Sequence, residues 1–340
     1  MPARRNYKYI LSLIPGLLVV TGNLLGGAWV AANTIFSLGV LGLVEWVAPE
    51  DKNNDSKRND WFPDLLLYCH VGLQLIALGS LIYFASLSGS KPWLILLASL
   101  STGINTGGSG IVVAHELIHR KEGRFRFLGK LLLFTAGNFY FCIDHLKGHH
   151  RWVGTINDPA TSRQGESLYR FAIRSATGQA KSSWKLETER LIKKGSRYPS
   201  GFGNYVTAAI SLELVALLAV QLLYGWIVLL ALIIQGVVAC FLLEYTNYIE
   251  HYGLKRTGDE RVSAVHSWQT DKVISRFFLI DLSRHADHHY QASKPYHTLM
   301  THKESPVLPG GYVSMIFLAL VPPLFFKIVN PVLDKHLAAG

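Results

Sequence analysis

Histidines gather in three short windows of this 340-residue chain, at residues 115–119, 145–150 and 285–289. The windows hold eight of the fourteen histidines, whereas random placement would put fewer than one there on average. The eight residues are His115, His119, His145, His149, His150, His285, His288 and His289. Imidazole is the commonest side-chain ligand for zinc, copper, iron and nickel, so the windows predict a metal site.

The spacing within the windows suits metal binding. His115 and His119 lie four residues apart, and His145 and His149 repeat this spacing. The third window combines spacings of three and four. On a helix such side chains project from one face about one turn apart, so each window can present two or three imidazoles in one direction. Because eight imidazoles exceed what one ion holds, we predict two metal ions.

A ninth candidate ligand is His251, which stands in the segment NYIEHYG directly after Glu250. A ligating imidazole normally donates its other N–H to a carboxylate or a carbonyl, which fixes its tautomer. Several acidic residues next to the windows are candidates for that supporting role, and exposed surface carboxylates are the alternative reading. They are Glu116, Asp144, Asp158, Glu250 and Asp287.

Residues 115–119 also satisfy HExxH, the motif of zinc proteases, with Glu116 as the general base. A protease of this kind needs one further ligand and would leave six clustered histidines without a purpose. It is therefore a remote alternative. The three scattered cysteines and the absence of CxxC exclude a disulfide framework and a zinc ribbon, so any redox centre must use other ligands.

The elements that must position these residues are apolar. Charged residues make up 16% of the chain, well below the roughly 25% of soluble proteins. Charge is nearly absent from six runs, each about as long as a membrane-spanning helix and apolar on all sides. The runs are 9–26, 28–44, 65–87, 92–114, 205–223 and 226–243. We therefore predict an all-α polytopic membrane protein that forms one integral-membrane domain over 1–340, and not a cleaved signal peptide followed by a secreted domain.

Basic residues predict the orientation. Lys and Arg precede the first helix and fill the loops after the second and fourth runs, so both termini, the loop after the second run and the segments 115–204 and 244–340 are expected in the cytoplasm. All three histidine windows then share one side, as a cytoplasmic cap. The apolar segment 127–143 is short and holds Lys130, so we expect it at the interface or under the bundle. His70 and Glu213, at membrane depth, must face the bundle interior or a cavity.

Several motifs in a fixed order resemble the membrane-bound alkane 1-monooxygenase family, integral-membrane non-haem diiron hydroxylases related to xylene monooxygenase and membrane fatty-acid desaturases. The resemblance covers about residues 92–331. It rests on HELIHRKE (115–122), DHLKGHHRWVGTINDPATSRQGESLYRF (144–171), TNYIEHYGL (246–254), HSW (266–268), LSRHADHHYQASKPYHTL (282–299) and LPGGY (308–312). Asp144, Ser283 and Ala286 stand where the family usually has Glu, Gln and Ser, and none of these departures removes a presumed ligand.

The resemblance implies all nine histidines, His251 included, as ligands of two ferrous ions, with His266 in a supporting role. It also implies terminal hydroxylation of medium-chain n-alkanes with O2, in a bacterial inner membrane. Substrate would enter from membrane lipid, so no aqueous transit is needed. An aromatic-methyl (xylene-type) monooxygenase and a fatty-acyl desaturase or decarboxylase are the alternatives. No motif supports nucleic-acid binding.

Electrons must come from a partner, because the chain has no CxxC and no Rossmann glycine fingerprint. The resemblance implies rubredoxin with an NAD(P)H-dependent reductase, or a ferredoxin-type donor. Residues 115–204 hold 16 of the 33 Lys and Arg residues. That basic surface suits either an acidic partner or anionic lipid headgroups.

Overall fold

The computed structural model describes residues 6–54, 61–87 and 89–339. These residues form helices, with two isolated β-bridges, Glu50 to Lys272 and Gln269 to Val307, and no longer strand in the described part. The predicted all-α class is confirmed.

Six helical segments of the described residues are long and apolar enough to cross a membrane. They are Asn6–Leu25, Gly27–Val47, Trp61–Ser86, Pro92–His119, Tyr205–Tyr224 and Trp226–His251. The chain is therefore a multi-pass membrane protein, and all six predicted runs are recovered. The fourth and sixth segments extend beyond the predicted ends at 114 and 243, because the helices continue after the apolar sequence stops. His119 and His251 thus lie in the last turns of these segments.

The spanning segments contain several helical elements. They are η1 (Asn6–Leu13), α1 (Ile14–Leu25), η2 (Gly27–Ala31), α2 (Ala32–Thr34), η3 (Ile35–Leu41), α3 (Gly42–Val47), α4 (Trp61–Ser86), α5 (Pro92–Asn105), η4 (Thr106–Ile111), α6 (Val112–His119), α11 (Tyr205–Tyr224) and α12 (Trp226–His251). Pro92 stands at the first position of α5, where its missing N–H costs no hydrogen bond, and the Asn204 side chain caps α11.

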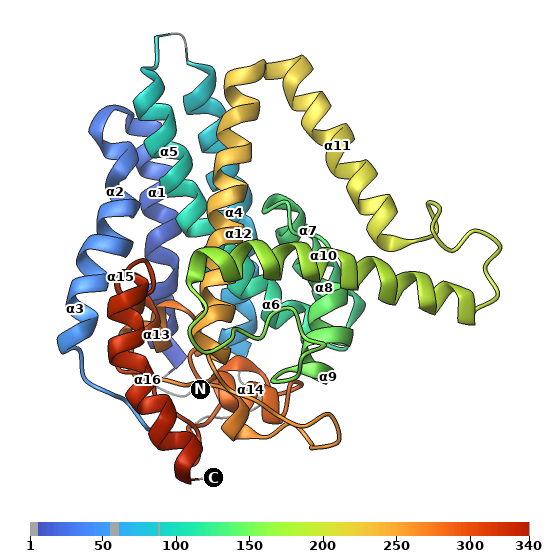
Figure 1. Cartoon of the computed structure of the whole chain (residues 1–340). Coiled ribbons are helices and arrows are strands. Elements are labelled where there is room, and N and C mark those ends of the chain that lie inside the picture. The colour runs from blue at the N-terminus through green and yellow to red at the C-terminus, as the bar shows by residue number, and fades with distance from the viewer. Residues whose placement is uncertain (1–5, 55–60, 88, 340) are drawn as a thin grey trace.

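The remaining elements form a cap that packs beside one half of the bundle and continues beyond its end (Figure 1). They are α7 (Gly123–Thr135), α8 (Phe141–Asp144), η5 (His145–His149), α9 (His150–Trp152), α10 (Leu168–Lys193), η6 (Ala264–His266), α13 (Val273–Phe278), α14 (His285–Tyr290), η7 (Tyr296–Thr298), α15 (Tyr312–Ala319) and α16 (Pro322–Ala339). Figure 1 shows α9 and α14 beyond the ends of the long helices, at the end of the bundle that we call the histidine end.

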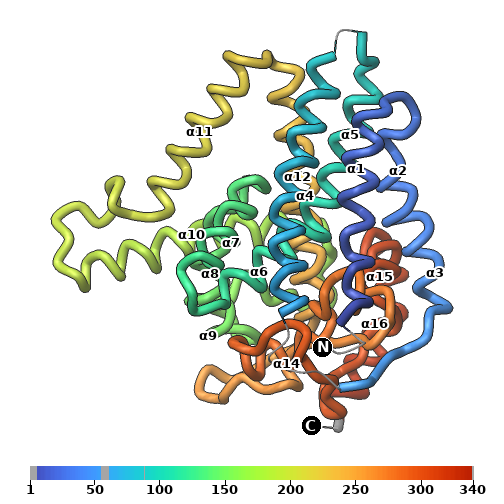
Figure 2. Tube along the Cα trace, turned by 180° about the vertical axis from the view of Figure 1, so that it is seen from behind, coloured from blue at the N-terminus to red at the C-terminus, as the bar shows by residue number. Residues whose placement is uncertain are grey.

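The long helices are not equally packed. α12 lies against α5 at Gly103, where an added Cβ would come within 2.7 Å of the Gln235 carbonyl oxygen, so glycine permits this close approach. In contrast, α11 leans away from the other helices in both Figure 1 and Figure 2. Its outer faces are free to meet lipid.

Two further apolar segments, 127–143 and 311–326, lie at the edge of the bundle. In 127–143, α7 ends at Thr135 and α8 follows, and neither is among the membrane-length helices of the described residues. α7 packs on α6, and an added Cβ at Gly129 would meet the Ala114 carbonyl oxygen at 3.1 Å. Segment 311–326 is divided into α15 and α16, with Pro322 at the start of the second helix.

A buried ion pair joins the first helix to the cap. The fully buried Arg276 donates from Nε to Oδ1 of Asp281 at 2.7 Å and also to the Asp51 carbonyl oxygen. The Tyr9 hydroxyl donates to the other oxygen of Asp281. These contacts hold η1 against α13.

Replacing Arg276 with alanine should destabilise the fold by about 3–5 kcal/mol, because Asp281 would stay buried without its main cation. Unfolding in detergent, followed by circular dichroism, measures this loss. Lys185→Ala removes an exposed 4.0 Å ion pair with Glu189 and should cost less than about 1 kcal/mol. Equal losses in the two variants would show that the buried pair does not stabilise the fold.

Candidate metal centre

All nine predicted histidines converge at the histidine end. α6 contributes two of them, η5 and α9 three, the end of α12 one, and α14 three. Their candidate ligand nitrogens form two groups, and within each group these nitrogens lie within 4.8 Å of one another. The first group is His115, His119, His145, His150 and His288, and the second group is His149, His251, His285 and His289.

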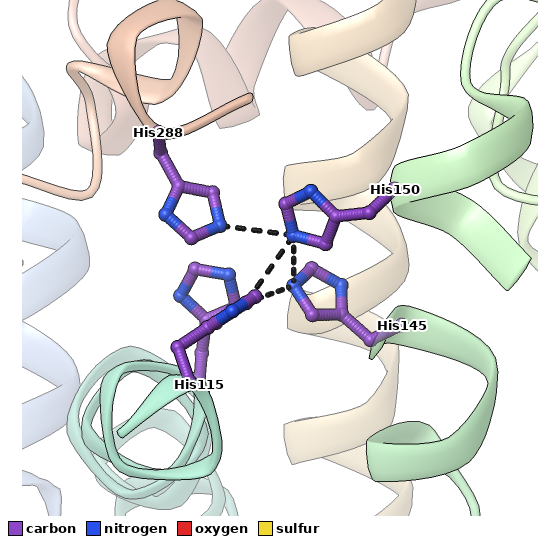
Figure 3. Close-up of side chains that lie close together, drawn as sticks. His115, His145, His150 and His288 are labelled. Carbon is purple, nitrogen blue, oxygen red and sulfur yellow. Dashed lines mark hydrogen bonds between the residues drawn. The ribbon is translucent and has the colours of Figure 1, made fainter. Parts of the chain in front are cut away.

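The first group is joined by four short contacts between imidazole nitrogens. The Nε2 atoms of His119, His145 and His150 form a triangle with sides of 3.0, 3.0 and 3.2 Å. Nε2 of His288 lies 3.1 Å from Nε2 of His150. Figure 3 shows the labelled rings turned toward one common space between the helices.

The second group is built in the same way. Nε2 of His289 lies 3.2 Å from Nε2 of His149 and 2.9 Å from Nε2 of His285. The His251 ring packs against the rings of His149 and His289, with centroids 4.8 and 5.0 Å apart. The groups are neighbours, because the rings of His150 and His289 have centroids only 4.6 Å apart.

These nitrogen separations fit metal ligands. Two imidazole nitrogens bound at right angles to one ion, at about 2.1 Å each, lie about 3.0 Å apart. Hydrogen bonding alone does not satisfy the groups, because Nε2 of His115 and Nε2 of His251 are buried without a hydrogen-bond partner. A buried nitrogen without a partner is costly, and a cation would satisfy it. The clusters can therefore hold metal.

Two of the three sequence windows, 145–150 and 285–289, contribute histidines to both groups. His149 and His150 are consecutive but belong to different groups, as do His288 and His289. His145 and His149, which an α-helix would place on one face, are also separated. The reason is that η5 is π-helical, and the amide of His150 bonds to the carbonyl of His145, so His150 lies one turn from His145.

Burial keeps most of these imidazoles neutral. Loss of solvent and the neighbouring imidazoles lower the pKa of His145, His150 and His288 well below the ordinary value, and the same holds for His285 and His289. Neutral imidazole is the form that binds a metal ion.

His149 has an anionic partner. Burial would lower its pKa, but the Asp158 carboxylate holds the pKa of His149 above the ordinary value. The Nδ1 of His149 lies 2.9 Å from Oδ2 of Asp158, and Thr161 donates to the same oxygen at 2.6 Å. Asp158 thus fixes the ring so that its Nε2 points into the second group.

Two other predicted supporting residues contact the second group. Oε2 of Glu250 lies 3.2 Å from Nε2 of His285. Tyr312, the last residue of the LPGGY motif, is assigned no role of its own from sequence; its hydroxyl donates to Oε1 of Glu250 at 3.0 Å. His266 acts through its backbone, since its carbonyl oxygen accepts from Nδ1 of His251 at 3.3 Å.

The remaining predicted carboxylates have other partners. Glu116 accepts from Nε of Arg120 at 2.8 Å. Asp287 contacts Lys294 and His302, each at 2.7 Å. Asp144 is buried beside Gly148, and loss of solvent raises its pKa to about 7.

An apolar cavity of about 90 Å³ lies within the bundle, next to the histidines. Residues from α1, η3, α5, α12, α13 and α15 line it. Gly107, Val112, Thr246 and Leu282 line both this cavity and a smaller one of about 30 Å³ that His115, His145 and His285 also line. An apolar molecule in the larger cavity would therefore pass these four residues to reach the histidines.

The family model described as fatty acid desaturase matches residues 91–319, about two thirds of the chain and including every residue of both groups. The fold and the site thus define a multi-pass membrane enzyme of the fatty acid desaturase class. Comparison with curated relatives identifies the family within this class. Alkane 1-monooxygenase 1 of Alcanivorax borkumensis is 34% identical over 96% of this chain and 84% of its own length. The chain belongs to the alkane 1-monooxygenase family.

Further relatives agree with this assignment. Alkane 1-monooxygenase of Acinetobacter baylyi is 31% identical, over 98% of this chain and 86% of its own. The xylene/toluene monooxygenase hydroxylase component of Pseudomonas putida is 30% identical, over 89% of this chain and 82% of its own length. The protein is therefore a monooxygenase, an oxidoreductase that uses O2 and acts on a hydrophobic substrate.

Proposed function

We propose that the protein hydroxylates the terminal carbon of medium-chain n-alkanes, with one iron ion in each histidine group. The observation that carries the proposal is the pair of adjacent groups of five and four imidazoles, together with the apolar cavity beside them. The overall reaction converts R–H, O2, two electrons and two protons into R–OH and water. Iron, when bound, supplies the reduction of O2 and the oxidation of the C–H bond.

The residues of the chain supply binding and geometry. The apolar cavity takes an alkane directly from the surrounding lipid and excludes water. Val112 and Leu282, which line both cavities, direct the chain end toward His115 and His285. Phe141 stacks on the His145 ring with centroids 4.6 Å apart and shields that edge of the first group. The cavity lining is largely aliphatic, which suits a linear hydrocarbon.

Electrons are proposed to come from rubredoxin that an NAD(P)H-dependent reductase reduces, with a ferredoxin-type donor as the alternative. The proposed location is a bacterial inner membrane, with both termini and the histidine end in the cytoplasm. The excess of basic residues in the loops at the histidine end supports this orientation.

The function is tested by purifying the full chain in detergent, counting its metals and assaying it with reduced rubredoxin. Two irons per chain and conversion of octane to 1-octanol are the expected results. One zinc without iron would exclude the diiron proposal.

A second candidate, hydroxylation of aromatic methyl groups, is favoured by the 30% identity to the xylene/toluene enzyme component. Turnover of toluene but not octane would select it.

Asp158→Asn tests the ligand role of His149. Loss of the carboxylate should weaken iron binding in the second group, or activity, by roughly 10–100-fold, because the amide holds the ring less firmly. Iron per chain and octane turnover measure this. Asp287→Asn is the matched control: it is equally buried, but its partners are Lys294 and His302, so iron per folded chain should not change. Equal iron loss in both variants would contradict the assigned role of Asp158.

A further inference from the structure

A large cleft opens at the histidine end, outside the bundle. Its volume is about 850 Å³, and it is lined by two walls, segments 154–163 and 253–258, together with Arg174 and Gly178 of α10. We call it the basic cleft. Both walls follow the last residues of the elements that carry His150 and His251, so the cleft lies beyond the spanning helices.

The described lining of the cleft is positively charged. Its cations are Arg163, Arg174, Lys255 and Arg256, and its single carboxylate is Asp158. Two of these charges are balanced locally, since Arg174 pairs with Glu166 at 2.7 Å and Asp158 with His149 at 2.9 Å.

The other three cations give the cleft its net charge. Arg163 and Lys255 are both exposed, one on each wall. The buried Arg256 donates to the carbonyl oxygens of Arg151 and Val153, at 2.7 and 2.9 Å, so these contacts leave its charge uncompensated. The acidic Glu260, beyond the end of the second wall, lies 3.3 Å from Nε2 of His266.

Both walls lead directly to the second histidine group. On one wall, Asp158 is one hydrogen bond from His149. On the other, Gly253 follows His251 by two residues, and its amide donates to the Ser162 carbonyl oxygen of the first wall at 3.0 Å. The floor of the cleft is therefore separated from the second group by a single layer of residues.

We propose that the basic cleft is the docking surface of an acidic one-electron carrier protein, and that electrons enter at the second histidine group. This inference rests on the proposed function, which requires an external donor. Each docked carrier is oxidised by one electron. Two such transfers supply the two electrons that, with two protons, O2 and the R–H substrate, give R–OH and one water.

The cleft fits a transient protein partner. Opposite charges steer such partners together and set their orientation, and an apolar contact stabilises the encounter. Ile156 supplies that contact, because its side chain is 93% exposed in the turn that lines the cleft. A flat lipid surface would meet Ile156 and the rim but not the recessed floor at Asp158, which is 3% exposed. Charge suits either partner, and the recessed shape favours a protein over anionic lipid headgroups.

The test measures binding of an acidic rubredoxin to the full chain in nanodiscs of zwitterionic lipid, with and without bound iron. The double variant Arg163→Glu, Lys255→Glu should bind at least roughly tenfold more weakly than the unaltered chain. The control Lys193→Glu, Lys194→Glu changes the net charge equally at the exposed end of α10, outside the cleft, and should bind within about twofold of the unaltered chain. Binding should also weaken as ionic strength rises.

A second readout is the rate at which the iron-loaded chain oxidises reduced rubredoxin at low carrier concentration. In the double variant Arg163→Glu, Lys255→Glu this rate should fall by the same factor as the affinity. Equal effects of the two double variants, or binding that does not respond to salt, would overturn the proposal. The proposal would also be overturned by two results together. Rubredoxin would no longer bind the chain in nanodiscs of anionic lipid, and the double variant Arg163→Glu, Lys255→Glu would bind anionic vesicles more weakly than the unaltered chain. The cleft would then bind lipid. Because carrier binding is measured without iron, failure to hydroxylate octane would count against the proposed function alone.

Discussion

With one iron in each histidine group, as proposed, replacing His251 with alanine should lower the iron content from two ions per chain to about one and reduce alkane hydroxylation by more than about a hundredfold. The second group has four histidines, so this change leaves three. His119→Ala instead reduces the first group from five histidines to four, and four imidazoles still form a complete tetrahedral set. We therefore expect His119→Ala to retain more iron than His251→Ala, although both lose activity.

Iron per chain after gel filtration, together with Mössbauer spectra of protein loaded with ⁵⁷Fe, measures this asymmetry. The remaining spectral component of His251→Ala should match a component of the unaltered protein, because the first group is intact. His336→Ala, in the C-terminal helix and outside both groups, is the control and should keep two irons. Full iron content in His251→Ala would remove this residue from the ligand set.

The sequence predicts the membrane-spanning helices well, because long apolar runs follow from the requirement that a lipid-exposed backbone bonds within its own helix. It predicts their ends less well. The fourth and sixth segments continue to His119 and His251, because polar residues that are buried in the cap extend a helix without contributing to its hydropathy. Hydropathy locates the hydrocarbon core and not the whole helix.

The sequence also predicts which histidines meet, but not how they divide. α-Helical spacing pairs His145 with His149, whereas the π-helical turn of η5 pairs His145 with His150. A single extra residue in a turn carries no compositional signal. In the same way, Asp158 and Asp287 both lie near the windows, and only packing decides that Asp158 contacts a histidine of the groups while Asp287 contacts Lys294 and His302.

The apolar cavity could not be predicted from sequence either. Its lining runs from Pro15 to Ile316 and comes from helices that are far apart in the chain. Each contributes one or a few ordinary apolar residues, and their meeting depends on tertiary packing. The cavity therefore provides the sharpest structure-based test of substrate access.

Val112→Phe should reduce kcat/KM for octane by roughly fifteen- to sixtyfold while leaving the iron content unchanged. Val112 lines the apolar cavity and also the two smaller cavities that reach the histidines. The phenyl ring adds four carbons at this passage and displaces part of the alkane chain. Loss of two or three buried methylene groups, at about 0.8 kcal/mol each, corresponds to a change of this size. Shorter alkanes should lose less activity than octane.

Val113→Phe is the matched control for this prediction. Val113 is the next residue of α6 and is also buried, but it lines none of these three cavities. Overpacking at Val113 should lower the thermal midpoint, because an enlarged side chain in a packed core costs about 1–3 kcal/mol. It should leave the ratio of octane to shorter-alkane turnover unchanged. If both variants shift that ratio equally, the effect of Val112 is general strain on α6, and the alkane must reach the histidines by another path.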